Sequence, residues 1–180
     1  WNGLSLPWMA FGYGVSMTPL QTLTFYNAVA NNGEMVKPSF IKSIGSFGED
    51  PIHEIDKEII MPSICSDETL KSVQIMLKNV VEKPWGTANN IYDKNIKIAG
   101  KTGTSQTGYA SGEIEYVSSF VGYFPADNPK YSAIVVINKP DKSKGFYGNS
   151  VAAPVFKKVA QKIITGIPIE IEISKKDILF

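Results

Sequence analysis

The sequence predicts an α+β fold in which helices flank an antiparallel sheet, and two observations support this fold class. Three segments, near residues 18–32, 66–83 and 150–165, have the capping residues and the apolar spacing of helices. Between the second and third segments the apolar period falls to two, and β-branched and aromatic residues are enriched. Because these strands follow one another with no helix between them, they are expected to form one antiparallel sheet.

The first helix is expected over residues 19–30. Thr18 precedes it and can form a capping box with Gln21, while Pro19 takes the first position, where no backbone donor is needed. Asn32-Gly33 is typical of a helix C-terminus. The segment is apolar nearly all round, so we expect the core to bury it.

Short β-like runs mixed with glycine and proline occupy residues 34–64, which predicts a hairpin-like excursion from the main fold. A second helix is expected to begin after Ser66, because two acids follow in its first turn, where the helix dipole favours them. Pro84 ends this helix. Its buried stripe is expected to consist of Leu70, Val73, Leu77 and Val80.

Three strands are expected next, at 96–99, 117–124 and 131–138, and the turn at 125–129 joins the last two as a hairpin. The final helix is expected to begin at Ser150, with Pro154 in its first turn. Its expected inward residues are Val155, Val159 and Ile163, and its expected solvent-facing residues are Lys157, Lys158 and Lys162.

Composition and charge exclude several classes of function. With 180 residues, of which 43% are hydrophobic and 19% charged, the chain can form a packed core. Eighteen basic and 17 acidic residues leave a net charge of +1, so a nucleic-acid partner has no support. One cysteine and one histidine exclude a disulfide framework and a metal cluster, and no cofactor is expected. No apolar run is long enough to span a membrane, and no signal peptide opens the chain.

The two ends of the sequence suggest a fragment of a longer polypeptide. The chain opens at Trp1 without an initiator methionine, and apolar patterning is under way by Leu4. Near the C-terminus, residues 167–173 alternate apolar and acidic side chains, as in an edge strand or a linker. The expected organisation is therefore one domain portion over residues 1–167 and a strand or linker tail over 168–180.

The hexapeptide Lys101–Gln106, directly after the first expected strand, is the strongest candidate site. An ammonium, three hydroxyls and a glycine together suit an anion or a developing oxyanion, because glycine lets a ligand approach the backbone. A plain polar turn after a strand is an equal alternative on these residues alone. A phosphate loop is rejected, because Asn95 replaces its first glycine and a strand, not a loop, precedes the lysine.

The combination of motifs is more specific than the hexapeptide. A strand carrying Lys101-Thr102-Gly103-Thr104, a hairpin at 116–138 and a helix opening at 149–156 resemble the C-terminal half of the transpeptidase domain of penicillin-binding proteins. Residues 12–21, 30–33 and 86–88 resemble segments of the monofunctional, class B enzymes. The resemblance covers about residues 8 to 165. It is closest to the septal-division and elongation transpeptidases, between which these motifs do not distinguish.

The resemblance implies a β-lactamase/transpeptidase-like fold with an active-site serine and three motifs, the third being Lys-Thr-Gly. By this resemblance Lys101 aids proton transfer and holds the substrate electrostatically, and Thr102 and Thr104 bind its terminal carboxylate. The Lys-Thr-Gly motif lines one wall of the active site, and Gly103 keeps this wall flat. The backbone N–H of Thr104 is one donor of the oxyanion hole. Ser105 and Gln106 complete the expected substrate-binding segment.

The first two motifs of the family are not found in these residues. No Ser-x-Asn occurs, and the one Ser-x-x-Lys begins at Ser39, in a β-like run after the helix that should follow the nucleophile. We therefore expect no nucleophile in this chain and no catalysis by the fragment alone. The nucleophile, its lysine base and the second motif are expected upstream.

The resemblance implies that the intact protein is a peptidoglycan D,D-transpeptidase that is acylated by β-lactams. Three alternatives remain: a non-enzymatic β-lactam sensor, a D,D-carboxypeptidase or β-lactamase relative, and a binding module in which the motif has no role. The implied partners are stem peptides, β-lactams and other cell-wall synthesis or division proteins. The implied location is the outer face of the cytoplasmic membrane, with an upstream tether.

Overall fold

The structure is a computed structural model that describes residues 1–10, 12, 14–45, 52–108 and 114–166. Its order of elements is helix, four short strands, helix, three long strands and helix, with a short helix at the start and a 3₁₀ turn before the long strands. The elements are α1 (Ser5–Ala10), α2 (Pro19–Ala30), β1 (Met35–Val36), β2 (Ser43–Ile44), β3 (His53–Glu54), β4 (Ile59–Met61), α3 (Asp67–Glu82), η1 (Asn89–Ile91), β5 (Ala99–Thr107), β6 (Glu115–Phe124), β7 (Tyr131–Asn138) and α4 (Gly148–Thr165).

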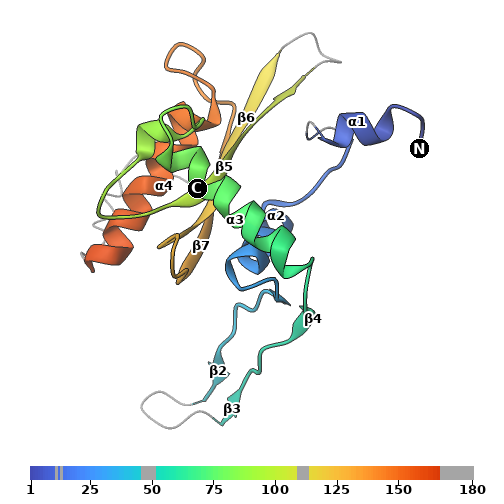
Figure 1. The fold of residues 1–180 in the computed structure, drawn as a ribbon, viewed down its shortest axis with the longest axis vertical. Helices are drawn as coiled ribbons and strands as arrows, with labels where there is room; N and C mark the ends of the chain where they lie inside the picture. The colour runs from blue at the N-terminus through green and yellow to red at the C-terminus, as the bar shows by residue number, and fades with distance from the viewer. Residues whose placement is uncertain (11, 13, 46–51, 109–113, 167–180) are drawn as a thin grey trace, which may run out of the picture.

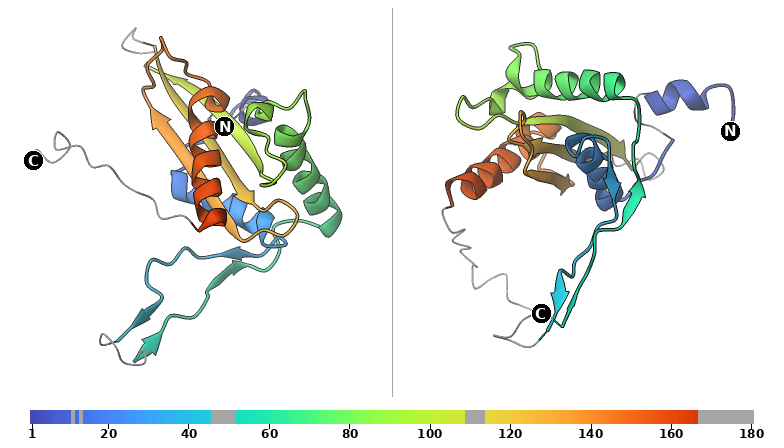
Figure 2. Two further views of the ribbon diagram at one scale, coloured as in Figure 1. Left: turned by 90° about the vertical axis from the view of Figure 1, so that its left-hand side faces the viewer. Right: turned by 60° about the horizontal axis from the view of Figure 1, so that its bottom comes forward.

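The predicted α+β class is confirmed. Strands β5, β6 and β7 form an antiparallel sheet in that order, so the expected 125–129 turn does join β6 to β7 as a hairpin. Helix α4 covers one face of this sheet, while α2 and α3 lie on the other (Figures 1 and 2). The result is a three-layer arrangement in which β6, the central strand, touches helices on both sides.

Side chains of β6 alternate between two cores, as a strand with both faces covered requires. Phe120 and Phe124 face α4, where their ring centroids lie 4.8 Å and 5.6 Å from that of Phe156. Tyr123 points the other way and packs with Val29 of α2 and with α3. Burial raises the pKa of Tyr123 to about 12.

Helices α2 and α3 begin at the predicted caps. Thr18 and Gln21 form the capping box of α2, and Ser66 accepts a hydrogen bond from the backbone N–H of Thr69. The expected burial of α2 is wrong, because Leu20 is 41% exposed and Phe25 is 45% exposed. Within the described residues, α2 has the sheet and α3 on one side only, and that side buries Ala28 and Val29.

Helix α4 begins two residues earlier than predicted, and its inward face is not the predicted one. Val155 and Ile163 are exposed, whereas Phe156 and three alanines of α4 are buried. Both sets repeat at a spacing of four, so the sequence period alone does not choose between them. The small side chains face the sheet because they let the helix approach it closely. The buried set is Ala152, Ala153, Phe156 and Ala160.

The predicted excursion at 34–64 is a two-stranded arm, which projects from the rest of the fold (Figure 1). Strand β1 pairs with β4, and β2 pairs with β3, both antiparallel. Helix α1 was not predicted from the sequence, and none of its residues is buried. The expected tail at 168–180 lies outside the described residues, so its assignment stays a prediction. No helix among the described residues has the length and apolar character needed to cross a membrane.

Asp127, in the turn between β6 and β7, ties this hairpin to α3 and to the residues before β5. Its Oδ1 lies 2.5 Å from Lys78 Nζ, and its Oδ2 lies 2.6 Å from Lys97 Nζ. The hydrogen bonds from Lys78 and Lys97 hold the pKa of Asp127 at about 2. Because this pKa is below that of an unfolded aspartate, the stabilisation is present above about pH 4 and is lost as pH falls towards 2.

We expect Asp127→Asn to lower the unfolding free energy of the intact protein near neutral pH by about 1 kcal/mol or less, because water screens a half-exposed carboxylate. The difference from the wild type should shrink as pH falls from 4 to 2, as thermal unfolding at several pH values will show. Asp141→Asn is the matched control, since the bonds that the structure describes for Asp141 all lie within its own loop, to Ser143 and Lys144. An equal effect of both substitutions would contradict the linking role of Asp127.

Candidate functional site

The hexapeptide Lys101–Gln106 lies inside strand β5, not in a turn after a strand. The expected strand at 96–99 is therefore displaced: β5 begins at Ala99 and continues to Thr107, paired residue by residue with β6. Apart from its β-branched threonines, this polar sequence carries no strand signal, and the ladder with β6 stabilises it as a strand. A phosphate loop is excluded by the same finding, because Lys101 and Thr102 have strand geometry.

Alternation along β5 divides the motif between the two faces of the sheet. Lys101 pairs with Val121 and Gly103 pairs with Ser119, on the face of α2 and α3. The other face, towards α4, carries Thr102, Thr104 and Gln106. Ser105 is exposed and shares the face of Lys101.

The backbone of Thr104 points away from the sheet. The N–H of Lys139 donates to Tyr116 O at 2.9 Å, so the even-numbered residues of β6 bond towards β7 and the odd-numbered ones towards β5. In the register of β5 with β6, Gly103 and Ser105 then bond inward to β6. The N–H and C=O of Thr104 therefore face the outer side of β5, which is an edge strand among the described residues. With no described strand beyond β5, an N–H in this position can donate to a ligand.

Two contacts order the beginning of the motif. Lys101 Nζ donates to Thr102 O at 2.9 Å, and it makes no ion pair with any described residue. The hydroxyl oxygens of Thr102 and Thr87 lie 3.3 Å apart, which joins β5 to the loop after α3. An exposed ammonium without a carboxylate partner leaves positive potential on the open edge of the sheet.

The end of the motif contacts the start of α4. The N–H of Gly148 donates to Thr104 Oγ1 at 3.0 Å. Ser118, which pairs with Thr104 across the two strands, is fully buried, and its hydroxyl donates to Phe146 O. Sequence reasoning missed Ser118 and Gly148. The two serines that interrupt the apolar run of β6, Ser118 and Ser119, were the signal available.

Ser39 lies in the arm, away from β5, where its hydroxyl donates to Ile41 O at 2.8 Å. Its surroundings are those of an exposed loop, and no described contact joins it to Lys101. The prediction that Ser39 is not the nucleophile stays a prediction. No group of three metal-ligating side chains occurs in the part of the chain that the structure describes.

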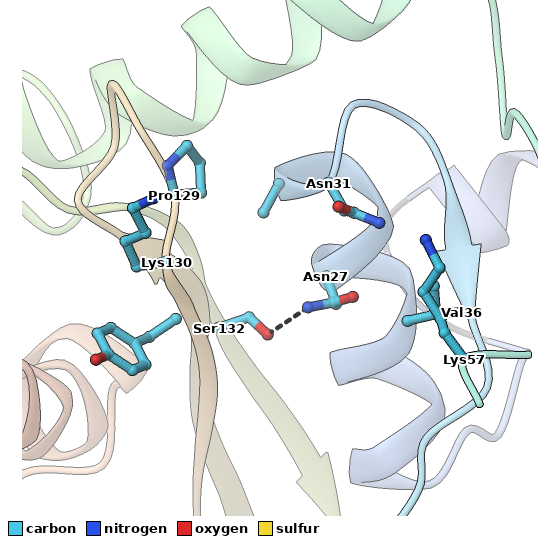
Figure 3. A pocket seen from close by; sticks show the side chains of 9 residues that line it. Asn27, Asn31, Val36, Lys57, Pro129, Lys130 and Ser132 are labelled. Atoms are coloured by element: carbon cyan, nitrogen blue, oxygen red, sulfur yellow. Dashed lines mark hydrogen bonds between the residues drawn. The ribbon is translucent and has the colours of Figure 1, made fainter. Parts of the chain in front are cut away.

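A pocket of about 260 Å³ lies between α2, β1 and the start of β7 (Figure 3). Within it Asn27 Nδ2 donates to Ser132 Oγ at 3.0 Å. Its nine lining residues include none of the motif residues. The motif residues therefore lie on the edge of the sheet, apart from this pocket.

Several curated relatives are similar to this chain in sequence, and several solved structures are similar to it in fold. The chain is 33% identical over 166 residues to peptidoglycan D,D-transpeptidase FtsI of Buchnera aphidicola, covering 91% of the chain and 27% of the relative. It is 33% identical over 152 residues to stage V sporulation protein D of Bacillus subtilis, covering 81% of the chain and 22% of the relative. Penicillin-binding protein 3 of Mycobacterium tuberculosis, solved with ampicillin, matches with 30% identity and a TM-score of 0.72, over 94% of the chain and 39% of that structure.

The chain thus spans about a quarter of the length of these curated relatives. The sequence model of the penicillin-binding protein transpeptidase domain matches residues 1–161, nearly the whole described chain. The matched region includes all three long strands, the motif on β5 and most of α4. The chain belongs to the transpeptidase domain family of penicillin-binding proteins.

Proposed function

We propose that this chain forms one wall of the active site of a peptidoglycan D,D-transpeptidase. The observation that carries the proposal is the position of Lys101-Thr102-Gly103-Thr104 on an edge strand, with the Thr104 N–H facing outward. In this role the Thr104 N–H stabilises the oxyanion of a tetrahedral intermediate. Lys101 supplies positive charge and aids proton transfer, while the hydroxyls of Thr102 and Thr104 bind the substrate carboxylate.

Gly103 supports this proposal because a side chain there would alter the wall. A Cβ at this position would lie 2.5 Å from Ser119 Oγ. With glycine the face of β5 between Lys101 and Ser105 stays flat, so an extended substrate can lie along it. Ser105 and Gln106 continue the same edge and are proposed to contact the substrate beyond the carboxylate.

The reaction needs residues outside this chain. A serine upstream attacks the D-Ala-D-Ala stem peptide, D-Ala leaves, and the acyl group passes to an amine of a neighbouring strand. The proposal places the intact protein outside the cytoplasm, held by an upstream tether, with other cell-wall synthesis or division proteins as partners. The relatives' names, which include a peptidoglycan D,D-transpeptidase, support the substrate class.

The test is acylation of the intact protein by excess benzylpenicillin, followed by intact mass and peptide mapping. We expect one penicilloyl adduct on a serine upstream of Trp1. An adduct on Ser39 would contradict the expectation that the nucleophile lies upstream of this chain. The absence of any adduct would contradict the assignment of the intact protein as a transpeptidase.

Incubation with a stem peptide and an acceptor amine separates the related activities. Cross-linked product is expected for the transpeptidase. Hydrolysed stem peptide alone would indicate a carboxypeptidase, whereas stable acylation by penicillin without turnover of peptide would indicate a sensor.

A further inference from the structure

We propose that Ser118 and Gly148 are positioning residues that orient the Thr104 hydroxyl towards the substrate carboxylate. The inference rests on the proposed function, because it concerns how that same wall is ordered. Neither residue belongs to the Lys-Thr-Gly motif. They act through the first turn of α4, which contacts β5 at Thr104 (3.0 Å between Gly148 N and Thr104 Oγ1).

Ser118 holds the segment that leads into α4. It is 0% exposed, and its hydroxyl donates to the carbonyl of Phe146, two residues before the helix begins. Ser118 and Thr104 are a non-hydrogen-bonded cross-strand pair, the type in which side chains lie closest. The two hydroxyls of this pair therefore contact the same short segment, residues 146–148.

Position 148 requires glycine because β5 and β6 pack directly against it. A Cβ there would lie 2.4 Å from Ser119 O and 2.6 Å from Gly103 O, both backbone atoms that cannot move away cheaply. The N-cap residue Tyr147 makes no side-chain capping bond, so the first N–H of the helix takes its acceptor from β5 instead. The helix start and the motif strand are thereby held in one geometry.

This geometry fixes what the Thr104 hydroxyl can do. A hydroxyl has one donor and two acceptor sites, and Gly148 N–H occupies an acceptor site, so the proton is directed elsewhere. The acceptor of that proton is none of the described residues, and Thr104 is exposed. A hydroxyl that accepts from the N-terminus of an 18-residue helix is also polarised, which makes it a stronger donor to an anion.

The experiment compares acylation of the intact protein by benzylpenicillin and by its methyl ester, which lacks the charged carboxylate. The wild type is expected to prefer the free acid. Ser118→Ala should lower the second-order rate constant with the free acid about tenfold, the scale of one hydrogen bond, and leave the rate with the ester within about twofold. Ser150→Ala is the matched control, because among the described residues Ser150 bonds only to Tyr147 O, within the same turn.

A double-mutant cycle separates positioning from general damage. In a Thr104→Val background, Ser118→Ala should cause no further loss with the free acid. Gly148→Ala should lower both stability and selectivity, because its Cβ would meet two backbone oxygens. Ser118→Cys removes the hydroxyl with little change in volume, so the inference stays testable if Ser118→Ala does not fold. Thermal unfolding of each variant accompanies the rates.

Equal losses with acid and ester, or an additive cycle, would overturn the positioning role while leaving the proposed function standing. Wild-type rates with both compounds in Ser118→Ala would also overturn the positioning role. A wild-type protein that neither compound acylates would instead overturn the proposed function, and the inference would fall with it.

Discussion

Lys101→Ala in the intact protein is expected to lower the rate of acylation by benzylpenicillin by about 10²- to 10³-fold, the cost of removing one electrostatic contact to a developing charge. Among the described residues Lys101 Nζ has only Thr102 as a hydrogen-bond partner and forms no ion pair, so its charge is available to a ligand. Stopped-flow or gel-based labelling with a fluorescent penicillin will measure the rate. Thermal unfolding should change little, because Lys101 is exposed.

Two further variants define the role of this ammonium. Lys101→Arg keeps the charge but changes its shape, so it should retain part of the activity. Lys71→Ala makes the same charge change on the exposed surface of α3 and should label at the wild-type rate. Wild-type labelling by Lys101→Ala would refute the assignment of β5 as a wall of the active site.

Gly122→Val is expected to destabilise the domain by about 3 kcal/mol or more, the upper range for overpacking. Gly122 of β6 pairs with Gly100 of β5, next to Lys101. A Cβ at Gly122 would lie 2.2 Å from Ala99 O and 2.9 Å from Gly100 Cα, so the two strands would have to separate. Because β5 carries the motif, penicillin labelling should be lost together with the cooperative unfolding transition.

The matched control is Gly3→Val, because a Cβ at Gly3 has nothing within 4 Å among the described residues. This substitution should change the unfolding free energy by less than about 0.5 kcal/mol. The measurement is chemical or thermal denaturation of the intact protein, with limited proteolysis as a second probe. Normal stability of Gly122→Val would show that the close approach of β5 and β6 is not needed.

Local features of the sequence predicted the elements whose signals are local. The Thr18–Gln21 box fixed the start of α2, and the apolar run at 131–138 gave the bounds of β7. The Lys-Thr-Gly motif and its neighbours were sufficient to indicate the family, since the family is recognised by short segments in a fixed order.

Several features that depend on contacts between distant residues were not predicted. The prediction of the inward face of α4 was wrong because two stripes with the same period occur on this helix. Only the fit of Ala152 and Phe156 against β6 decides which stripe is buried. Residues 101–107 form a strand only because they pair with β6, and the sequence of this segment does not show that pairing. The exposed side of α2 shows the same limit, because hydrophobicity does not say which neighbours are present.

The sequence by itself therefore determined the α+β class, the helix caps and the chemical groups of the candidate site. The tertiary structure decided that these groups lie on an open strand edge, with the Thr104 N–H outward and its hydroxyl bonded to Gly148. The physical reason is the separation along the chain over which each interaction acts. Capping and periodicity act within a few residues, whereas the bonds from Ser118 to Phe146 and from Gly148 to Thr104 join residues 28 and 44 positions apart.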